Sequence, residues 1–255
     1  MLRTDIAWST EKRIVVRGYD LPTEIIGKMN LGDFAFLELA GRKPSESESA
    51  VFNALAVTLV EHGLTPSALA ARLTILGAPE ALQGAVAAGL LGLGTTFAGT
   101  MEGAARFLQD SLRGASDDAD LDAMAEQIVA DHRAQGKHIP GLGHNLHKSG
   151  DPRTPALFAI ADSHGVSGQH VALMKKVETA ASEAFNRHLP INATGAIGAI
   201  GSELGLEWSV MRGVAVMARS IGLVAHLLEE SKQPSLVKEM WLRTEAEATE
   251  HMREE

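Results

Sequence analysis

Hydrophobic residues recur at intervals of three and four along most of the chain, which is the period of an amphipathic helix. Two runs show this period most clearly: Val171, Met174, Val177, Ala181 and Phe185, then Val214, Met217, Ile221, Val224 and Leu228. Only Ile14–Val16 has the character of a strand, and it is too short to organise a sheet. The pattern predicts an all-α chain of about ten to twelve helices.

Proline and glycine mark the expected helix ends. A proline is tolerated in the first turn of a helix, so we expect helices to begin at Thr65-Pro66, Ala78-Pro79, Thr154-Pro155 and Gln233-Pro234. Left-handed glycines commonly follow the last turn, so helices are expected to end at Gly63, Gly77, Gly114, Gly165 and Gly205. Ser45 and Glu48 form a capping box ahead of the run from Ala50 to His62.

The composition narrows the possible classes of protein. A chain of 255 residues, 45% of them hydrophobic, suits one compact body or two lobes that share a core. The net charge of −9 argues against a nucleic-acid partner, and the lack of cysteine excludes disulfides and thiolate chemistry. The stretch Leu82–Met101 is glycine-rich and fits a buried helix pair better than a membrane span. We expect a cytoplasmic protein that binds no membrane.

One motif indicates a ligand site. Gly141-Leu142-Gly143-His144 is followed closely by Asp151-Pro152-Arg153. Two glycines let the backbone approach a ligand and present N–H groups to a pyrophosphate or nucleotide. The histidine would stand beside that group as a proton donor, and the guanidinium of Arg153 matches a carboxylate. Either segment alone would fit a surface turn, but the pair at this spacing favours a site.

Three further features each allow two interpretations. His62, in Glu61-His62-Gly63, is either a helix cap or a catalytic group. Asn192 and Thr194, at the start of a glycine-rich helix, are either helix caps or ligand contacts. Arg219, in an apolar helix, either extends to solvent or meets an anion. The glycines of the helix, Gly195, Gly198 and Gly201, indicate tight helix packing.

These segments in this order resemble the citrate synthase superfamily. The series is EHG, a glycine-rich helix, GLGH with DPR, an Asn-x-x-Gly segment at 192–195 and R-S-x-G-x-x-x-H at 219–226. The similarity extends from about Gly18 to Leu228 and is strongest to the lyase branch, which comprises citryl-CoA lyase and the citrate-synthase-like end of ATP-citrate lyase. The resemblance implies an all-α fold and a homodimer. It implies a large helical domain of residues 1–105 and 205–255, and a smaller domain of residues 106–204 that closes over CoA.

The resemblance also assigns roles to individual residues. It implies that His144 polarises the keto oxygen of oxaloacetate or the hydroxyl of citryl-CoA, and that His62 acts at the substrate. Arg153 and Arg219 become carboxylate clamps. Phe97 stands where citrate synthases proper carry a catalytic histidine, as it does in the lyase branch.

The remaining assignments concern binding. Asn192 would contact the substrate, and Arg243 near the C-terminus could reach a neighbouring subunit's site as a carboxylate ligand. CoA, bound as an acyl-CoA substrate, would lie along the segment 137–143, and the residues expected to bind it are Lys137, Ile139, Gly141, Leu142 and Gly143. No metal site is expected, because the histidines lack paired ligand spacing with carboxylates.

One departure from the family pattern affects the chemistry. The family's general base is the Asp of an Asn-Val-Asp motif, whereas this chain reads Asn192-Ala193-Thr194. A threonine hydroxyl is not a base of suitable pKa, although it could relay a proton through water. Three hypotheses follow: an enzyme that makes or cleaves the carbon–carbon bond between acetyl-CoA and oxaloacetate, a catalytically weak protein that binds CoA or a dicarboxylate, and a helical scaffold dimer without a small ligand.

Overall fold

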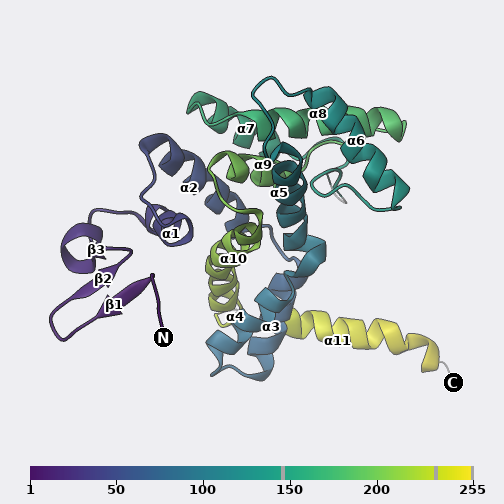
Figure 1. Cartoon of the computed structure of the whole chain (residues 1–255). Coiled ribbons are helices and arrows are strands. Elements are labelled where there is room, and N and C mark those ends of the chain that lie inside the picture. The colour runs from purple at the N-terminus through teal and green to yellow at the C-terminus, as the bar shows by residue number, and fades with distance from the viewer. Residues whose placement is uncertain (145–146, 233–234, 254–255) are drawn as a thin grey trace. The chain divides into compact units, whose positions relative to one another are not determined.

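The chain is built from helices, as Figure 1 shows. The structure, a computed structural model, describes residues 1–144, 147–232 and 235–253. In this part the α-helices are α1 (Leu31–Ala40), α2 (Glu46–Val60), α3 (Pro66–Gly77), α4 (Leu82–Leu91), α5 (Gly99–Leu112), α6 (Leu121–Ala134), α7 (Arg153–Ser163), α8 (Gln169–Ala184), α9 (Ala193–Glu203), α10 (Trp208–Glu230) and α11 (Leu236–Thr249). The expectation of an all-α chain is confirmed.

A small antiparallel sheet precedes these helices. Its strands are β1 (Ala7–Ser9), β2 (Ile14–Val16) and β3 (Tyr19–Asp20), in that order across the sheet. The expected strand at 14–16 is present, but the expectation that it stands alone is wrong. Val16 and Ile25 pack with Leu37 of α1, so the hydrophobic contact that stabilises the sheet comes from the first α-helix that follows it in the chain.

Most of the expected helix boundaries are observed. Thr65 caps α3 through the N–H of Ala68, and Ser45 and Glu48 exchange the two hydrogen bonds of a capping box at α2. Four of the five glycines are left-handed: Gly63, Gly114, Gly165 and Gly205. Gly77 is instead the last residue of α3.

The expected start of α4 at Ala78-Pro79 is wrong, because a turn intervenes and the helix begins at Leu82. α7 begins at Arg153, one residue before Thr154-Pro155. The expected start at Gln233-Pro234 lies outside the described residues.

The chain forms two compact units. One contains residues 1–58 and 100–212, and is called the N-terminal unit here; the other, the C-terminal unit, contains residues 59–99 and 213–255. The chain passes between them within α2, at the start of α5 and within α10. The division into a closing domain of residues 106–204 and a larger domain of the remaining helices stays a prediction.

Close helix contacts characterise the N-terminal unit. A Cβ on Gly198 of α9 would lie 2.9 Å from the carbonyl oxygen of Met101 in α5. A Cβ on Gly201 would lie 2.4 Å from the Met211 side chain. Gly198 faces backbone and therefore serves tight helix packing, as expected, whereas the neighbour of Gly201 is the flexible end of a side chain, which imposes a weaker restriction. The apolar run on α8 is buried from Val171 to Ala181, whereas Phe185 is exposed.

In the C-terminal unit, α3, α4 and α10 share a core that includes Ala71, Ala85 and Leu223. The apolar run of α10 is buried at Val214 but not over its second half, because Ile221, Val224 and Leu228 are 50%, 36% and 49% exposed. The buried positions are shifted to Leu223 and Leu227. α10 therefore has two apolar stripes, and a periodic pattern alone does not say which one packs.

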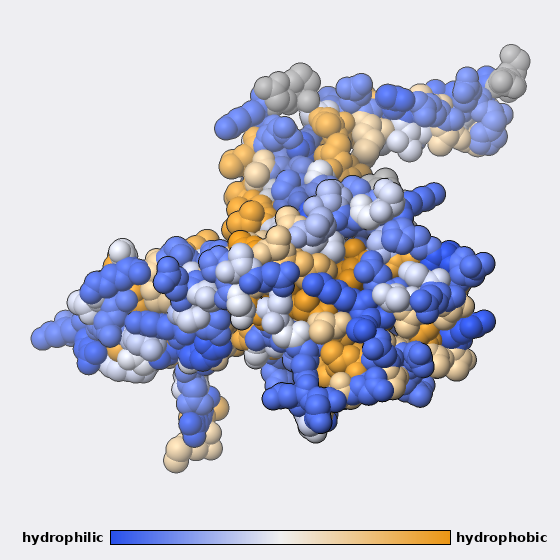
Figure 2. Space-filling view, turned by 90° about the horizontal axis from the view of Figure 1, so that it is seen from above, coloured by the Kyte–Doolittle hydropathy of each residue, from blue (hydrophilic) through white to orange (hydrophobic). Residues whose placement is uncertain are grey.

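By length and composition alone, α10 could cross a membrane, and so could α4 together with residues 94–112, a pair bent by 64°. This is weak evidence, because the core helix of a soluble protein has the same length and composition. Figure 2 shows hydrophilic residues over most of the visible face, with hydrophobic patches among them. The absence of a membrane partner stays a prediction.

Candidate functional site

The GLGH segment is a rigid loop bound to the chain just before α9. Gly141 and Gly143 have φ of 85° and 71°, which favours glycine at both positions. Leu142 forms an antiparallel bridge with Ile191. The N–H of Asn192 donates to Gly141 O at 2.9 Å, and the N–H of Gly143 donates to Pro190 O at 2.8 Å. Main-chain hydrogen bonds therefore hold the loop in place.

Gly141 also lies unusually close to α9. A Cβ on it would stand 2.5 Å from the Cα of Gly195, and a Cβ on Gly195 would stand 2.5 Å from Gly141 O. Only two glycines can meet in this way. Gly195, expected to serve helix packing, therefore allows the approach of the GLGH loop to the first turn of α9.

Asn192 and Thr194 are both hydrogen-bonded at the N-terminus of α9. Asn192 caps the helix, since its Oδ1 accepts from the N–H of Gly195, and its Nδ2 donates to Gly143 O at 2.6 Å. Thr194 Oγ1 donates to Asn192 Oδ1 at 2.6 Å and accepts from Thr100 Oγ1 at 3.0 Å. The capping interpretation holds for Asn192, and its role as a substrate contact stays a prediction.

His144 is in a defined tautomer. The backbone N–H of His147 can only donate, and it lies 3.1 Å from Nδ1 of His144. Nδ1 therefore accepts, and the proton of the neutral ring is on Nε2. Burial and the charge of His147 lower the pKa of His144, although Asp151 opposes this shift. A neutral imidazole with a proton on Nε2 is suited to polarise a substrate oxygen.

Asp151 and Arg153 form a bidentate ion pair within the DPR segment, which follows the GLGH loop in the chain. Arg153 donates from Nε at 3.0 Å and from Nη2 at 2.8 Å, and the N–H of Ala193 donates to the same carboxylate at 3.1 Å. Burial alone would raise the pKa of Asp151, but these donors outweigh it and hold that pKa far below its usual range. Asp151 thus joins the DPR segment to α9 and stays ionised.

A cleft of about 230 Å³ lies beside the GLGH loop. Its lining includes Ile139, Leu142 and Phe185, with three cationic side chains, Arg133, Lys137 and Arg187. Three of the expected CoA-binding residues, Lys137, Ile139 and Leu142, line it, whereas Gly141 and Gly143 belong to the adjoining loop. Arg133, Phe185 and Arg187 are not predicted at this cleft by the sequence, because Phe185 fits the apolar period of α8 and the two arginines belong to no motif.

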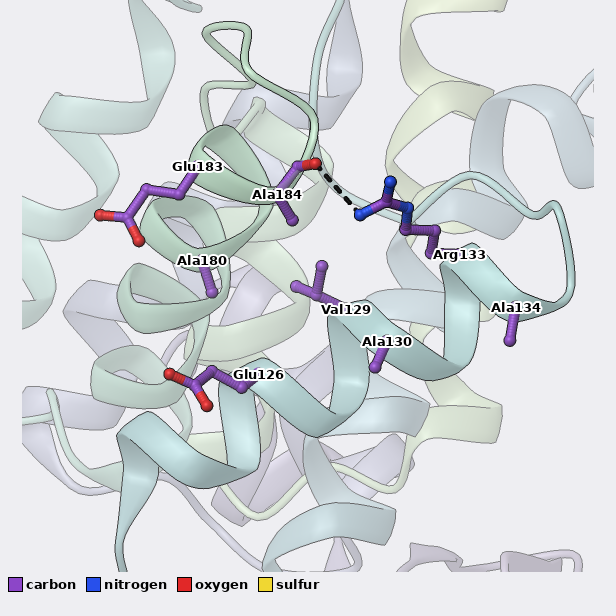
Figure 3. A pocket seen from close by; sticks show the side chains of 8 residues that line it. All are labelled: Glu126, Val129, Ala130, Arg133, Ala134, Ala180, Glu183 and Ala184. Carbon is purple, nitrogen blue, oxygen red and sulfur yellow. Dashed lines mark hydrogen bonds between the residues drawn. The ribbon is translucent and has the colours of Figure 1, made fainter.

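A larger groove of about 630 Å³ follows α6 and α8. Figure 3 shows Ala180 and Ala184 of α8 facing Val129 of α6, while Arg133 reaches the carbonyl of Ala184. Glu126 and Glu183 also line this groove. Two carboxylates disfavour a polyanionic ligand, so the smaller cationic cleft is better suited to phosphate groups.

In the C-terminal unit, His62 lies in a turn just after α2. The carboxylate of Glu61 accepts from the N–H groups of His62 and Gly63 at 2.8 and 2.6 Å. Arg219 on α10 is 9% exposed and donates from Nε to Leu59 O at 3.3 Å. It is therefore buried rather than extended to solvent. Arg243 on α11 is exposed and pairs with Glu247.

The expected site residues fall into two sets. His144, Arg153, Asn192, Thr194 and the expected CoA residues belong to the N-terminal unit. His62, Arg219 and Arg243 belong to the C-terminal unit. In the N-terminal unit the structure brings the GLGH loop, the DPR segment and the start of α9 together. In the C-terminal unit it places the EHG turn next to α10. The convergence of both sets on one cleft stays a prediction.

Comparison with known proteins identifies the family of this chain. The sequence model of the family "Citrate synthase, C-terminal domain" matches residues 26–239. The solved structure of citryl-CoA lyase from Hydrogenobacter thermophilus is 33% identical, with a TM-score of 0.82, and the match covers 92% of this chain and 89% of that one.

Two larger proteins also match. A probable ATP-citrate synthase of Dictyostelium discoideum is 26% identical over 80% of this chain and 34% of its own length. The ATP citrate lyase of Methanothrix soehngenii, solved with citrate and coenzyme A, has a TM-score of 0.76 at 23% identity, covering 91% of this chain and 39% of that one, and supports the fold alone. This chain thus spans about a third of the length of the curated relatives that it matches.

Proposed function

Because this chain belongs to the citrate synthase family, we propose that it is a citryl-CoA lyase-type enzyme, which cleaves citryl-CoA to acetyl-CoA and oxaloacetate or joins these two in reverse. The observation that carries this proposal is the similarity to citryl-CoA lyase over nearly the whole of both chains. The state of His144 agrees with the chemistry that such an enzyme needs.

In the cleavage direction, the hydroxyl group of the citryl moiety loses its proton and becomes a carbonyl. The carbon–carbon bond breaks, its electron pair forms the enolate of acetyl-CoA, and the enolate carbon takes up a proton. In the reverse direction, the Nε2–H of His144 donates to the oxaloacetate oxygen as negative charge develops there. In cleavage the same N–H stabilises the negative charge that develops on the hydroxyl oxygen, while the hydroxyl proton passes to water, because Nε2 already carries its proton.

Arg153 would hold a substrate carboxylate. Its Nε and Nη2 are engaged by Asp151, so the bidentate pair fixes the guanidinium plane and Nη1 is the group to meet the substrate. Arg219 and Arg243 are proposed as further carboxylate ligands, Arg243 across a subunit boundary. His62 is proposed to act at the same substrate.

CoA is proposed to lie in the cationic cleft beside the GLGH loop. Arg133, Lys137 and Arg187 supply three positive charges for its phosphates, and no carboxylate is found among the described residues that line the cleft. Ile139, Leu142 and Phe185 offer apolar surface for the base and the pantetheine arm. Because the chain has a net charge of −9, binding of an anionic ligand requires a local cluster of positive charges such as this one.

The test is turnover of citryl-CoA by the purified chain, with release of oxaloacetate followed through a coupled reduction by NADH. We expect release in the wild type and a loss of about 10²–10⁴-fold in kcat for His144→Ala. His251→Ala, at an exposed histidine, is the matched control and should not change kcat. Unaltered turnover in His144→Ala would refute the assignment.

A second candidate function is binding of CoA or a dicarboxylate with weak catalysis. Thr194 favours it, because its hydroxyl is hydrogen-bonded to Asn192 and Thr100 and is no base of suitable pKa. The carboxylate nearby, Asp151, is a poor base as well, since its pKa is held far below the usual range. Under the lyase proposal, Thr194 would pass a proton to the enolate only through water.

Thr194→Asp separates the two functions. If the wild type binds CoA and oxaloacetate, as measured by calorimetry, but releases no product, and Thr194→Asp gains citrate-forming activity, the binding function is supported. If the wild type turns over citryl-CoA and Thr194→Asp brings no gain, the lyase function stands. Thr194→Ser is the matched control, because it keeps the hydroxyl.

We further propose that the protein is a cytoplasmic homodimer. The second apolar stripe of α10, with Ile221, Val224 and Leu228 all at least 36% exposed, supports a face covered by another chain. Sedimentation equilibrium of Leu228→Glu beside the wild type tests this: a dimer that becomes monomeric supports the proposal, and a wild-type monomer contradicts it.

A further inference from the structure

One face of α10 contacts the end of α2 within the C-terminal unit. Arg219, Gly222 and His226 are spaced by three and four residues, so they lie on the same side of the helix. Arg219 Nε binds Leu59 O. A Cβ on Gly222 would lie 2.0 Å from Val60 O, so only glycine permits this close packing of α10 and α2.

His226 extends this contact to the EHG turn. Its Nε2 lies 3.1 Å from Oε1 of Glu61, and that oxygen also accepts from the N–H groups of His62 and Gly63. Burial alone would raise the pKa of Glu61, but these three donors outweigh it and lower that pKa. One carboxylate oxygen therefore connects α10 with the backbone on which His62 is carried.

Arg72 of α3 sets the tautomer of His226. Its Nε lies 3.1 Å and its Nη2 2.9 Å from Nδ1 of His226. A guanidinium can only donate, so Nδ1 accepts and the ring proton is on Nε2, where it points to Glu61. His226 can therefore form both hydrogen bonds only as the neutral Nε2–H tautomer.

A buried acidic residue compensates the charge of Arg72. Arg72 is 2% exposed, and its Nη1 donates at 2.7 Å to Glu230, which is 3% exposed at its side chain. Its Nη2 also contacts Glu229. A buried cation would be costly without these partners. The chain of contacts thus runs from Glu230 through Arg72, His226 and Glu61 to the turn of His62.

We propose that His226, oriented by Arg72, is a positioning residue that holds the Glu61 carboxylate against the N–H groups of His62 and Gly63 and so fixes the turn that carries His62. The proposal rests on the proposed function only for the catalytic role of His62. The contacts themselves exist whether or not that role is correct, so the proposed function and the positioning role of His226 can be tested separately.

Kinetics of citryl-CoA cleavage give the first test. His226→Leu removes the hydrogen bonding to Arg72 and to Glu61. It should lower kcat by roughly 10–100-fold, with KM nearly unchanged, because a misplaced His62 disturbs the reacting geometry. His226→Gln keeps an acceptor for Arg72 and an N–H donor for Glu61, and should retain most of kcat. Equal losses in the two variants would overturn the proposal.

The chain offers a matched control. His170 contacts Glu203 at 3.2 Å, and Glu203 accepts from the N–H groups of Gly168 and Val171. This is a similar set of an imidazole, a carboxylate and two backbone amides at the start of α8, although here the imidazole contacts Oε2 and the two amides donate to Oε1. His170→Leu should leave kcat unchanged.

A double-mutant cycle shows whether His226 acts through His62. If it does, His226→Leu has little further effect on kcat in a His62→Ala background. Losses that multiply would mean that His226 acts independently, which contradicts the proposal.

Amide hydrogen exchange, measured residue by residue by NMR, gives a readout that needs no activity. In His226→Leu the amides of His62 and Gly63 should exchange about tenfold faster than in the wild type, because their acceptor loses its support. Those of α4 should be unchanged, which excludes general unfolding. Unaltered exchange at His62 and Gly63 overturns the proposal. If the wild type fails to cleave citryl-CoA, the proposed function fails, and exchange still decides this inference.

Discussion

Two regions carry the residues proposed to act on the substrate, and they are held by different means. The GLGH loop and the start of α9 are joined by main-chain hydrogen bonds and by the contact of Gly141 with Gly195. The EHG turn is held to α10 by side chains, through Glu61, His226 and a buried arginine, beside the close approach of Gly222 to Val60 O. The GLGH loop itself is thus held by main-chain groups, and the carboxylate of the EHG turn by charged and polar side chains.

This difference determines how each region should fail. A glycine contact has no substitute, because any Cβ at 2.5 Å requires the backbone to move. An ionic network can keep its geometry when a conservative side chain replaces one member, but a buried charge left without its partner is costly.

Gly141→Ala should have the largest effect. The new Cβ would meet Gly195 at a position with φ of 85°, so steric overlap adds to backbone strain and the free energy of unfolding should fall by roughly 2–5 kcal/mol. Gly205→Ala is the control, since Gly205 has φ of 73° with nothing within 4 Å, and should lose only about 1–2 kcal/mol. Urea unfolding measures both, and equal losses would show that the contact with α9 is unimportant.

Arg72→Leu should have the second-largest effect on the free energy of unfolding. It leaves Glu230 buried without its cation, which is expected to cost roughly 3 kcal/mol or more, together with a fall in kcat through His226. Arg243→Leu removes an arginine from an exposed pair with Glu247 and should not change stability. Thermal unfolding compares them. A stability of Arg72→Leu equal to that of the wild type would show that the network contributes little.

Asn192→Ala should have the smallest effect on stability and a larger one on activity. It removes the cap of α9, at about 1 kcal/mol, and the hydrogen bond to Gly143 O, at about another 1 kcal/mol. Asn30→Ala removes the corresponding cap of α1 and should lose about 1 kcal/mol with no loss of kcat. Should the two variants show the same kcat, Asn192 would have no role in orienting the GLGH loop.

The helical class, most helix ends and the GLGH–DPR pair could be predicted from sequence, because each depends on local chemistry. Glycine, proline and capping residues act within one turn of the positions they mark. The spacing of GLGH and DPR was informative because a short connection forces the two segments together.

The other features of the fold and of the candidate site depend on contacts between residues that are distant in sequence. The two apolar stripes of α10 are equivalent in sequence, and only packing with α3 and α4 distinguishes the buried Leu223 from the exposed Val224. The same holds for Arg72, which has no motif of its own and acquires its partners from a helix about 150 residues later in the chain. Phe185 continued the core period of α8, yet it lines the cationic cleft.

Release of oxaloacetate from citryl-CoA by the purified chain would show directly that the protein is a lyase. We predict turnover by the wild type that falls about 10²–10⁴-fold in His144→Ala and is unchanged in His251→Ala. A wild type that binds citryl-CoA without releasing product, or a His144→Ala variant as active as the wild type, would contradict the account.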